Sequence, residues 1–241
     1  RLILSSAVVL ALLSFVDDLR PLPASMRFAA HVLAAGTSIH AGFAGQPMIV
    51  AVGLVLGLVW MTNLYNFMDG SDGLAGGMAV FGFGTYALMA WKAGHGDLAQ
   101  ASAAVAASSA AFLIFNFHPA RIFMGDIGSI PLGFLAATYG LEGWAREIWP
   151  LWLPGLVFSP FIVDASVTLG RRLLGGERIW QAHRNHYYQR LVRMGFGHRH
   201  TALAEYLLMS LAATSAVIIL DLEPDLQKWL LLAWATLYAA M

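Results

Sequence analysis

The chain has 241 residues, of which 59% are hydrophobic and 12% are charged, and its mean hydropathy is +0.66. Soluble domains carry about a quarter charged residues, so this composition predicts a polytopic membrane protein. The formal net charge of zero gives no indication of nucleic acid as a partner, and the lack of cysteine excludes disulfides, thiolate metal sites and a catalytic thiol.

Nine apolar segments are candidates for transmembrane helices, since a spanning helix needs about 20 apolar residues. We expect an all-α fold, a polytopic membrane helix bundle that forms a single transmembrane domain over residues 1–241. The chain opens with Arg1 directly before an apolar run, so we expect it to lack its true N-terminus. The segments are 1–16, 26–41, 47–62, 73–91, 98–115, 129–144, 148–169, 200–220 and 226–241.

The segments between these spans alternate between two sides of the membrane. One side carries residues 17–25, 63–72, 116–128 and a longer loop at 170–199, and it holds ten of the 14 Lys and Arg residues. The long loop alone supplies seven of the ten. Because cytoplasmic loops carry the Lys/Arg excess, this side is predicted to be cytoplasmic. The polar motifs lie in or beside the segments of this side.

Asp17 and Asp18 form the first motif, directly after an apolar run. Adjacent carboxylates repel each other and could provide a base or a cation site at the membrane surface. Arg20 could balance part of their charge. The alternative is a pair of solvated charges at a helix end.

The second motif, NLYNFMDGSDGLAGG at residues 63–77, places Asn63, Asn66, Asp69 and Asp72 at a strict spacing of three. Residues three apart are neighbours on a helix, so the row could wrap around a bound group, and its oxygens suit Mg²⁺. The alternative is a turn, which Asn, Asp and Gly favour. A turn does not explain the length and period of the row.

The third motif, FMGDIGS at residues 123–129, places Asp126 between two glycines. Asp126 could be a helix N-cap or a ligand to a metal held near phosphate. Phe123 could stack on a planar base, and Asn116 lies upstream in the same loop.

The last motif is HRNHYYQR at residues 183–190. Arginine forks match phosphate oxygens, so this segment predicts an anion site formed by His183, Arg184, His186 and Arg190. The alternative is a solvated basic loop on anionic lipid. Asp164 lies inside an apolar run, where carboxylates are rare, and its role stays open.

Together these motifs predict phosphoryl transfer from a nucleotide-linked donor to a lipid acceptor, with Mg²⁺ and positioning as the source of catalysis. An ion-coupled transporter is an alternative from another class, although transporter sites lie near the membrane midplane rather than at one face. An inactive or assembly protein is a third possibility.

The DD pair, NxxNxxDGxDGLAGG and FMGDxGS resemble the polyprenyl-phosphate N-acetylhexosamine-1-phosphate transferase superfamily, glycosyltransferase family 4, over about residues 1–200. The resemblance implies an enzyme of the bacterial inner membrane that transfers HexNAc-1-phosphate from a UDP-N-acetylhexosamine to undecaprenyl phosphate and releases UMP at the cytoplasmic face. HRxHxYQR resembles the branch that initiates O-antigen synthesis of lipopolysaccharide. The phospho-N-acetylmuramoyl-pentapeptide transferases of peptidoglycan synthesis are the alternative.

The resemblance also implies roles for single residues. Mg²⁺, or Mn²⁺ in its place, would be held by Asp126 and Asn66. The lipid phosphate would lie near Asp17 and Asp18, and the donor site would be lined by Asp69 and Asp72. Uracil would stack on Phe123 near Asn116, and the diphosphate or sugar would be held by His183, Arg184, His186 and Arg190. Family members begin with two further spans and a Lys-bearing loop, which implies a truncated form of an eleven-helix protein. A homodimer is left open.

Overall fold

The computed structural model describes residues 2–177 and 184–241. Within these ranges the chain is helical and contains no strand. The helices are α1 (Leu2–Leu19), α2 (Ala24–Phe43), α3 (Met48–Phe67), α4 (Leu74–Lys92), α5 (Gly96–Asn116), α6 (Gly125–Ala145), α7 (Trp152–Val157), α8 (Ser159–Leu174), α9 (Tyr187–Leu191), the π-helical turn η1 (Val192–Phe196), α10 (Gly197–Leu220) and α11 (Pro224–Ala240).

Every predicted apolar segment coincides with helix, and the segment 148–169 is the one that the structure divides. Its two parts, α7 and α8, meet at Phe158. Pro160 lies in the first turn of α8 and lacks the N–H that a continuous helix would need. The hydroxyl of Ser159 instead donates to the carbonyl of Leu156 at 2.6 Å. The break between α7 and α8 therefore coincides with a proline in the first helical turn, where its missing N–H is tolerated.

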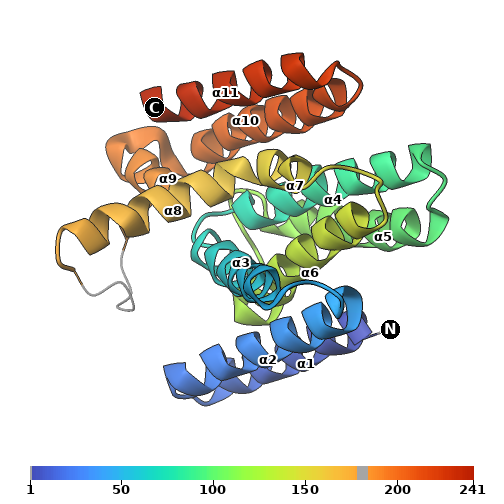
Figure 1. The fold of residues 1–241 in the computed structure, drawn as a ribbon. Helices are drawn as coiled ribbons and strands as arrows, with labels where there is room; N and C mark the ends of the chain where they lie inside the picture. Colours follow the sequence, from blue (N-terminus) through green and yellow to red (C-terminus); the bar gives the residue numbers. More distant parts are fainter. Residues whose placement is uncertain (1, 178–183) are drawn as a thin grey trace.

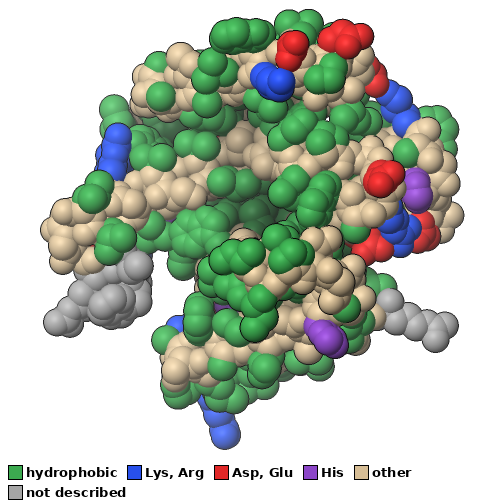
Figure 2. Space-filling view, viewed as in Figure 1, with side chains coloured by type: hydrophobic (Ala, Val, Ile, Leu, Met, Phe, Trp, Pro, Cys, Tyr) green, Lys and Arg blue, Asp and Glu red, His purple; other side chains and the backbone are tan. Residues whose placement is uncertain are grey.

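Five helical stretches are long and apolar enough to cross a membrane, within the part of the chain that the structure describes. They are Leu2–Leu19, Met48–Phe67, Leu74–Lys92, Gly96–Asn116 and Tyr187–Leu220. Hydrophobic side chains cover much of the visible surface, as a lipid-facing surface requires (Figure 2). The protein is therefore an integral membrane protein, while the count of nine spans stays a prediction.

The helices are arranged around α3 and α6 (Figure 1). The α1–α2 pair covers one side of these central helices, and α10 and α11 lie at the opposite edge. The helices α3 and α6 pack closely because Gly133 has no side chain: a Cβ there would lie 2.8 Å from the carbonyl oxygen of Met61. This contact brings the end of α3 against the start of α6.

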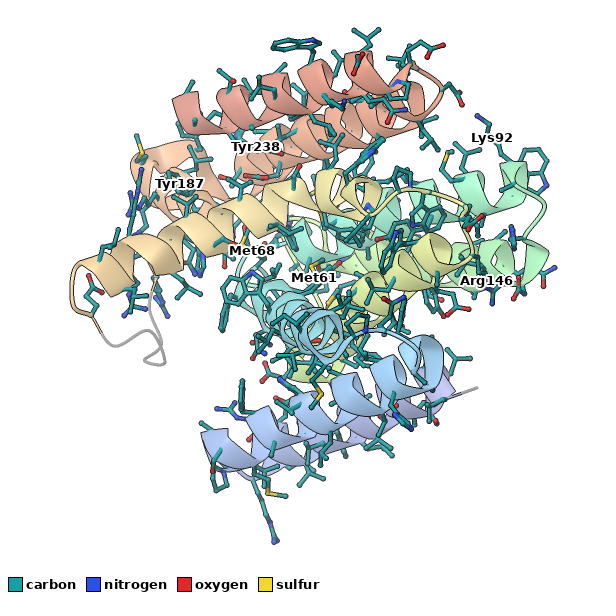
Figure 3. All side chains as sticks on the ribbon, viewed as in Figure 1. Met61, Met68, Lys92, Arg146, Tyr187 and Tyr238 are labelled. Atoms are coloured by element: carbon teal, nitrogen blue, oxygen red, sulfur yellow. The ribbon has the colours of Figure 1, made fainter. Side chains whose placement is uncertain are left out.

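The two ends of the bundle carry different residues. Lys92 and Arg146, which the sequence assigns to the non-cytoplasmic side, lie at one end, and Tyr187 of the HRNHYYQR segment lies at the other (Figure 3). The alternation of sides predicted from the sequence agrees with this placement. The long loop at 170–199 is partly helical, because it includes the end of α8, α9 and η1.

Candidate active site

A cluster of carboxylates lies where the end of α3 meets the start of α6. Asn66, in the last turn of α3, donates through Nδ2 to Asp126 Oδ1 at 2.7 Å and to Ser129 Oγ at 3.0 Å. Ser129 in turn donates to the carbonyl of Gly125 at 2.9 Å. Asn66 and Asp126, predicted to work together, are thus in direct contact, although their role as metal ligands stays a prediction.

Asp126 itself is the second residue of α6, after an N-cap at Met124 that makes no side-chain hydrogen bond. The N-cap alternative for Asp126 is therefore wrong. A carboxylate in a first helical turn is stabilised by the helix dipole and remains available to a ligand.

Asp69 follows α3 in the turn before α4 and faces the same helix start. Burial raises the pKa of the Asp69 carboxyl from 3.8 to about 7; repulsion from Asp126 adds to the rise, and a backbone hydrogen bond from Gly125 opposes it. The fold therefore holds Asp69 where a negative charge is disfavoured unless a cation accompanies it.

Asp18 approaches this cluster from the end of α1. Its Oδ2 lies 3.5 Å from the place that a Cβ of Gly125 would occupy. Gly125 also has a φ of +64°, a conformation that favours glycine. The FMGD glycine therefore allows the backbone to turn tightly into α6 beside a carboxylate.

Asp17 is held by groups that its sequence motif does not contain. Its Oδ2 pairs with Arg27 Nη1 at 2.9 Å, and its Oδ1 accepts the Leu22 backbone N–H at 2.6 Å. The same arginine nitrogen lies 3.9 Å from Asp126 Oδ2. Arg27, rather than Arg20, therefore pairs with these carboxylates. Sequence reasoning missed it because it lies ten residues from Asp17, on the next helix.

The donor chemistry of the cluster fits Mg²⁺, which prefers oxygen ligands and needs only one or two carboxylates when substrate phosphates and water complete its shell. Repulsion between Asp69 and Asp126 marks an excess of negative charge. Among the described residues, no group of three or more His, Asp or Glu side chains is close enough to hold a metal on its own. The arrangement fits a metal that is shared with a substrate, not a closed protein cage.

The row from Asn63 to Asp72 does not form the wall of one helix, because α3 ends at Phe67. Asn63 donates to the Val59 carbonyl at 2.7 Å and lies 3.2 Å from His31 Nδ1 on α2, so it joins two helices. The four side chains that are spaced three apart therefore contact different parts of the structure and do not line one surface.

Asp72 points away from the carboxylate cluster, toward the loop between α5 and α6. Its Oδ2 lies 2.7 Å from His118 Nδ1 and accepts the Ala120 backbone N–H at 3.3 Å. Asp72 thus lies beside His118, which sequence analysis did not single out, and its place in the donor site stays a prediction.

Asn116 is buried and links the turn before α4 to the loop between α5 and α6. Its Oδ1 accepts the Gly73 N–H at 3.0 Å, and its Nδ2 donates to the Ile122 carbonyl at 2.9 Å. In contrast, Phe123 is 76% exposed, which is the condition that stacking on a base requires. Asn116 is thus placed to shape the loop, and Phe123 is placed to meet a ligand.

Asp164 organises the HRNHYYQR segment. Its Oδ1 accepts the Tyr187 N–H at 2.9 Å and the Thr168 hydroxyl at 3.1 Å, and it lies 3.1 Å from His186 Nδ1. Its Oδ2 accepts the Tyr188 N–H at 3.1 Å. Asp164 therefore satisfies the free N–H groups at the start of α9, and it lies buried among four donors.

The predicted anion-binding residues of this segment have different environments. His186 is buried against Asp164, whereas Arg184 and Arg190 are exposed. Arg190 and Arg171 lie over the Tyr187 ring, each 5.3 Å from its centroid. His183 lies outside the described residues. The exposed arginines are thus free to meet an anion, while His186 has a structural position.

Tyr188 is a further residue that sequence reasoning missed. It is fully buried and donates through its hydroxyl to the Phe67 carbonyl at 3.0 Å. It also packs so closely on Gly70 that a Cβ there would overlap its hydroxyl. Tyr188 thereby connects α9 to the turn that carries Asp69.

The fold and this site define a class: a helical integral membrane protein with a carboxylate cluster and exposed arginines and aromatics at one end. The family model described as glycosyl transferase family 4 matches residues 1–143. The chain belongs to this family.

Two kinds of curated relatives are similar to the chain. The probable undecaprenyl-phosphate N-acetylglucosaminyl 1-phosphate transferase of Bacillus subtilis (strain 168) is 32% identical over 228 residues, which cover 88% of this chain and 64% of the relative. The phospho-N-acetylmuramoyl-pentapeptide-transferase of Geobacillus kaustophilus is 43% identical over 162 residues, or 67% of this chain and 48% of the relative. The phospho-N-acetylmuramoyl-pentapeptide-transferase of Geobacillus sp. (strain WCH70) is 41% identical over 113 residues, which cover 47% of this chain and 33% of the relative. The chain thus covers less than two thirds of each of these relatives.

Proposed function

We propose that the protein transfers a sugar-1-phosphate from a UDP-sugar to undecaprenyl phosphate at the cytoplasmic face of a bacterial inner membrane. The observation that carries this proposal is the convergence of Asp18, Asp69 and Asp126 with Arg27 at one end of the membrane bundle, in a chain of glycosyl transferase family 4.

In the proposed reaction, an oxygen of the lipid phosphate attacks the β-phosphorus of the UDP-sugar, the bond from that phosphorus to the UMP oxygen breaks, and UMP leaves. Such transfers depend on positioning and on neutralising negative charge. Arg27 would bind an approaching phosphate, and Asp17 would hold Arg27 in place. Mg²⁺, held by Asp126 and Asn66, would neutralise phosphate charge.

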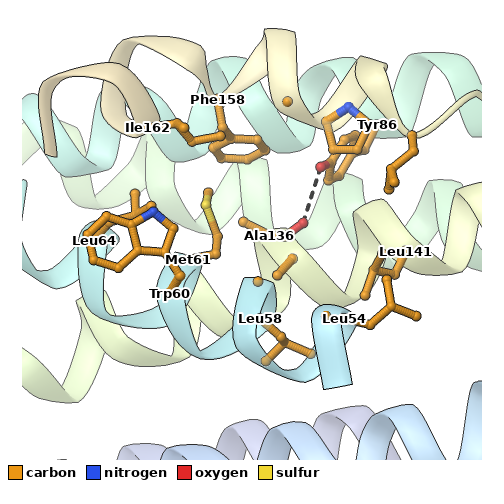
Figure 4. A pocket seen from close by; sticks show the side chains of 16 residues that line it. Leu54, Leu58, Trp60, Met61, Leu64, Tyr86, Ala136, Leu141, Phe158 and Ile162 are labelled. Atoms are coloured by element: carbon orange, nitrogen blue, oxygen red, sulfur yellow. Dashed lines mark hydrogen bonds between the residues drawn. The ribbon is translucent and has the colours of Figure 1, made fainter. Parts of the chain in front are cut away.

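An apolar cavity supports a polyprenyl acceptor. It has a volume of about 310 Å³ and lies between α3, α6, α7 and α8. Figure 4 shows its lining of Leu58, Met61, Phe158 and Ile162 with few polar groups, apart from Tyr86, whose hydroxyl donates to the Ala136 carbonyl at 3.1 Å. Such a lining can pack against isoprenoid units through van der Waals contacts and presents few polar groups that they would leave unpaired.

Two observations favour a UDP-HexNAc donor over a muramoyl-pentapeptide donor. The relative that aligns over 88% of this chain is named for N-acetylglucosaminyl 1-phosphate transfer. The segment HRNHYYQR resembles the O-antigen-initiating branch. We therefore propose the first membrane step of an envelope polysaccharide such as O-antigen.

The test measures UMP release by the purified protein in lipid nanodiscs with undecaprenyl phosphate and one donor at a time. We expect turnover with a UDP-N-acetylhexosamine, dependent on Mg²⁺. Asp126→Asn should lower turnover about 10- to 100-fold, as loss of a group that holds a metal does, while the melting temperature is kept. Asp225→Asn, at an exposed carboxylate on α11, is the matched control.

Turnover with the muramoyl-pentapeptide donor alone would reject the sugar assignment and keep the reaction class. Near-normal turnover of Asp126→Asn would remove this residue from the metal site. Solute flux into proteoliposomes without UMP release would instead favour the transporter.

A further inference from the structure

Two histidines outside the predicted site meet beside the turn between α3 and α4. His118 comes from the loop after α5, and His198 lies in the first turn of α10. Their rings are nearly parallel, with centroids 5.8 Å apart and an angle of 12° between the ring planes. Three segments that are distant in the sequence therefore place two imidazoles together.

Each imidazole is anchored through the same ring atom. His118 Nδ1 lies 2.7 Å from Asp72 Oδ2, and His198 Nδ1 lies 2.9 Å from Ser71 Oγ. Asp72 is fixed in turn by the backbone N–H of Ala120. In the described part of the chain, neither Nε2 forms a hydrogen bond. Both rings therefore have one nitrogen held by the protein and one available to a ligand.

The surroundings of the pair favour an anion. When protonated, each ring offers an Nε2–H donor, and Asp72 balances only one of the two positive charges. Arg121, in the loop of His118, and Arg199, next to His198, are both exposed. The first turn of α10 contains no acidic residue and has no side-chain cap, so its dipole also favours negative charge. A metal is a poorer occupant, because no group of three or more His, Asp or Glu side chains in the described residues is arranged to hold a metal ion, and Asp72 is hydrogen-bonded to Nδ1 of His118.

We propose that His118 and His198 form a binding site for a phosphate-type anion through their Nε2 atoms. The pair is anchored on Ser71 and Asp72, which lie two and three residues after Asp69. The site therefore lies on the same turn that carries Asp69, and the nucleotide diphosphate of the donor is the source that fits the proposed function, on which this assignment rests. The phosphate of an anionic lipid headgroup offers the same chemistry.

The test uses substitutions that separate the two ring nitrogens. Asparagine places its amide near the position of Nδ1 and removes Nε2, whereas glutamine places its amide near Nε2. The double variants H118N/H198N and H118Q/H198Q are compared with H40N, a matched change at an exposed histidine on α2. Kd for UDP is measured by titration calorimetry in nanodiscs made of neutral lipid, and the melting temperature is measured in parallel.

We expect H118N/H198N to weaken UDP binding at least about tenfold with an unchanged melting temperature. H118Q/H198Q should keep part of the affinity, and H40N should match the wild type. In turnover, H118N/H198N should raise KM for the donor more than it lowers kcat. A second arm measures stabilisation of each protein by phosphatidylglycerol; loss of that stabilisation, with UDP binding intact, would support the site and assign it to lipid.

Unchanged binding of both UDP and phosphatidylglycerol in H118N/H198N would overturn the proposal. Equal loss in both double variants, with a lower melting temperature, would also overturn it, because the histidines would then serve only to join three segments. Wild-type UMP release is independent of these outcomes, so failure of the anion site is distinguishable from failure of the proposed reaction.

Discussion

At the residue scale, Asp69 is a carboxylate whose negative charge the fold opposes. Burial and repulsion from Asp126 raise the pKa of Asp69 to about 7. The folded protein therefore keeps a proton on this carboxyl that the unfolded chain releases near pH 4. A residue that is costly to ionise without a cation is typical of sites where a charged ligand completes the structure.

The pH dependence of stability follows from this shift. Because Asp69 binds a proton in the folded state but not in the unfolded state between about pH 4 and pH 7, its contribution to stability is fully present below about pH 4 and is lost as pH rises through about 7. We expect the melting temperature in EDTA to drop between pH 5 and pH 8, and the drop to be smaller in Asp69→Asn. An equal drop in both proteins, measured by differential scanning fluorimetry, would reject this origin.

Asp164 has a different role, since it is buried and has four hydrogen-bonding groups around it. We expect Asp164→Ala to destabilise the protein by about 3–5 kcal/mol, as removal of one partner from a buried charged network does. It should also release α9, which limited proteolysis between α8 and α10 would detect. Asp225→Ala, at an exposed ion pair, should cost less than about 1 kcal/mol. Similar costs for the two variants would contradict this role.

At the scale of elements, the short helix α9 acts as a support for the turn that carries Asp69. Tyr188 joins α9 to this turn, because its hydroxyl donates to the Phe67 carbonyl at the end of α3 and packs against Gly70. Any side chain at position 70 would therefore require Tyr188 to move, whatever the role of Gly70 in the DG motif.

Gly70→Ala should displace Tyr188, lower turnover and cost about 1–3 kcal/mol through overpacking. The second substitution Tyr188→Phe removes the overlapping hydroxyl, so the double variant should recover part of the stability of Gly70→Ala. Gly84→Ala on α4, where a Cβ meets nothing within 4 Å, is the control. Melting temperatures of the wild type, the two single variants at Gly70 and Tyr188 and the double variant test whether the two positions are coupled. Strict additivity of the two single effects would exclude the coupling.

At the scale of the whole molecule, the apolar cavity and the carboxylate cluster share α3 and α6. Gly57 lines the cavity, and a Cβ there meets no other atom within 4 Å. Gly57→Leu should therefore fold and fill part of the space. We expect KM for undecaprenyl phosphate to rise about tenfold with UDP affinity unchanged. Gly84→Leu adds the same side chain to another spanning helix, and an equal effect there would reject the cavity as the lipid site.

The sequence by itself determined the positions of the apolar helices, because hydrophobic runs depend only on neighbours in the chain. The pairing of Asn66 with Asp126 was implied by the resemblance to a known family, since the two residues lie 60 positions apart. It did not show that α3 ends at Phe67, since the turn chemistry of DGSDG overrides the period of three. Only the tertiary structure decided which residues complete the site. Arg27, Tyr188, His118 and His198 enter it from separate helices and loops, and contacts between distant segments leave no periodic signal in one sequence.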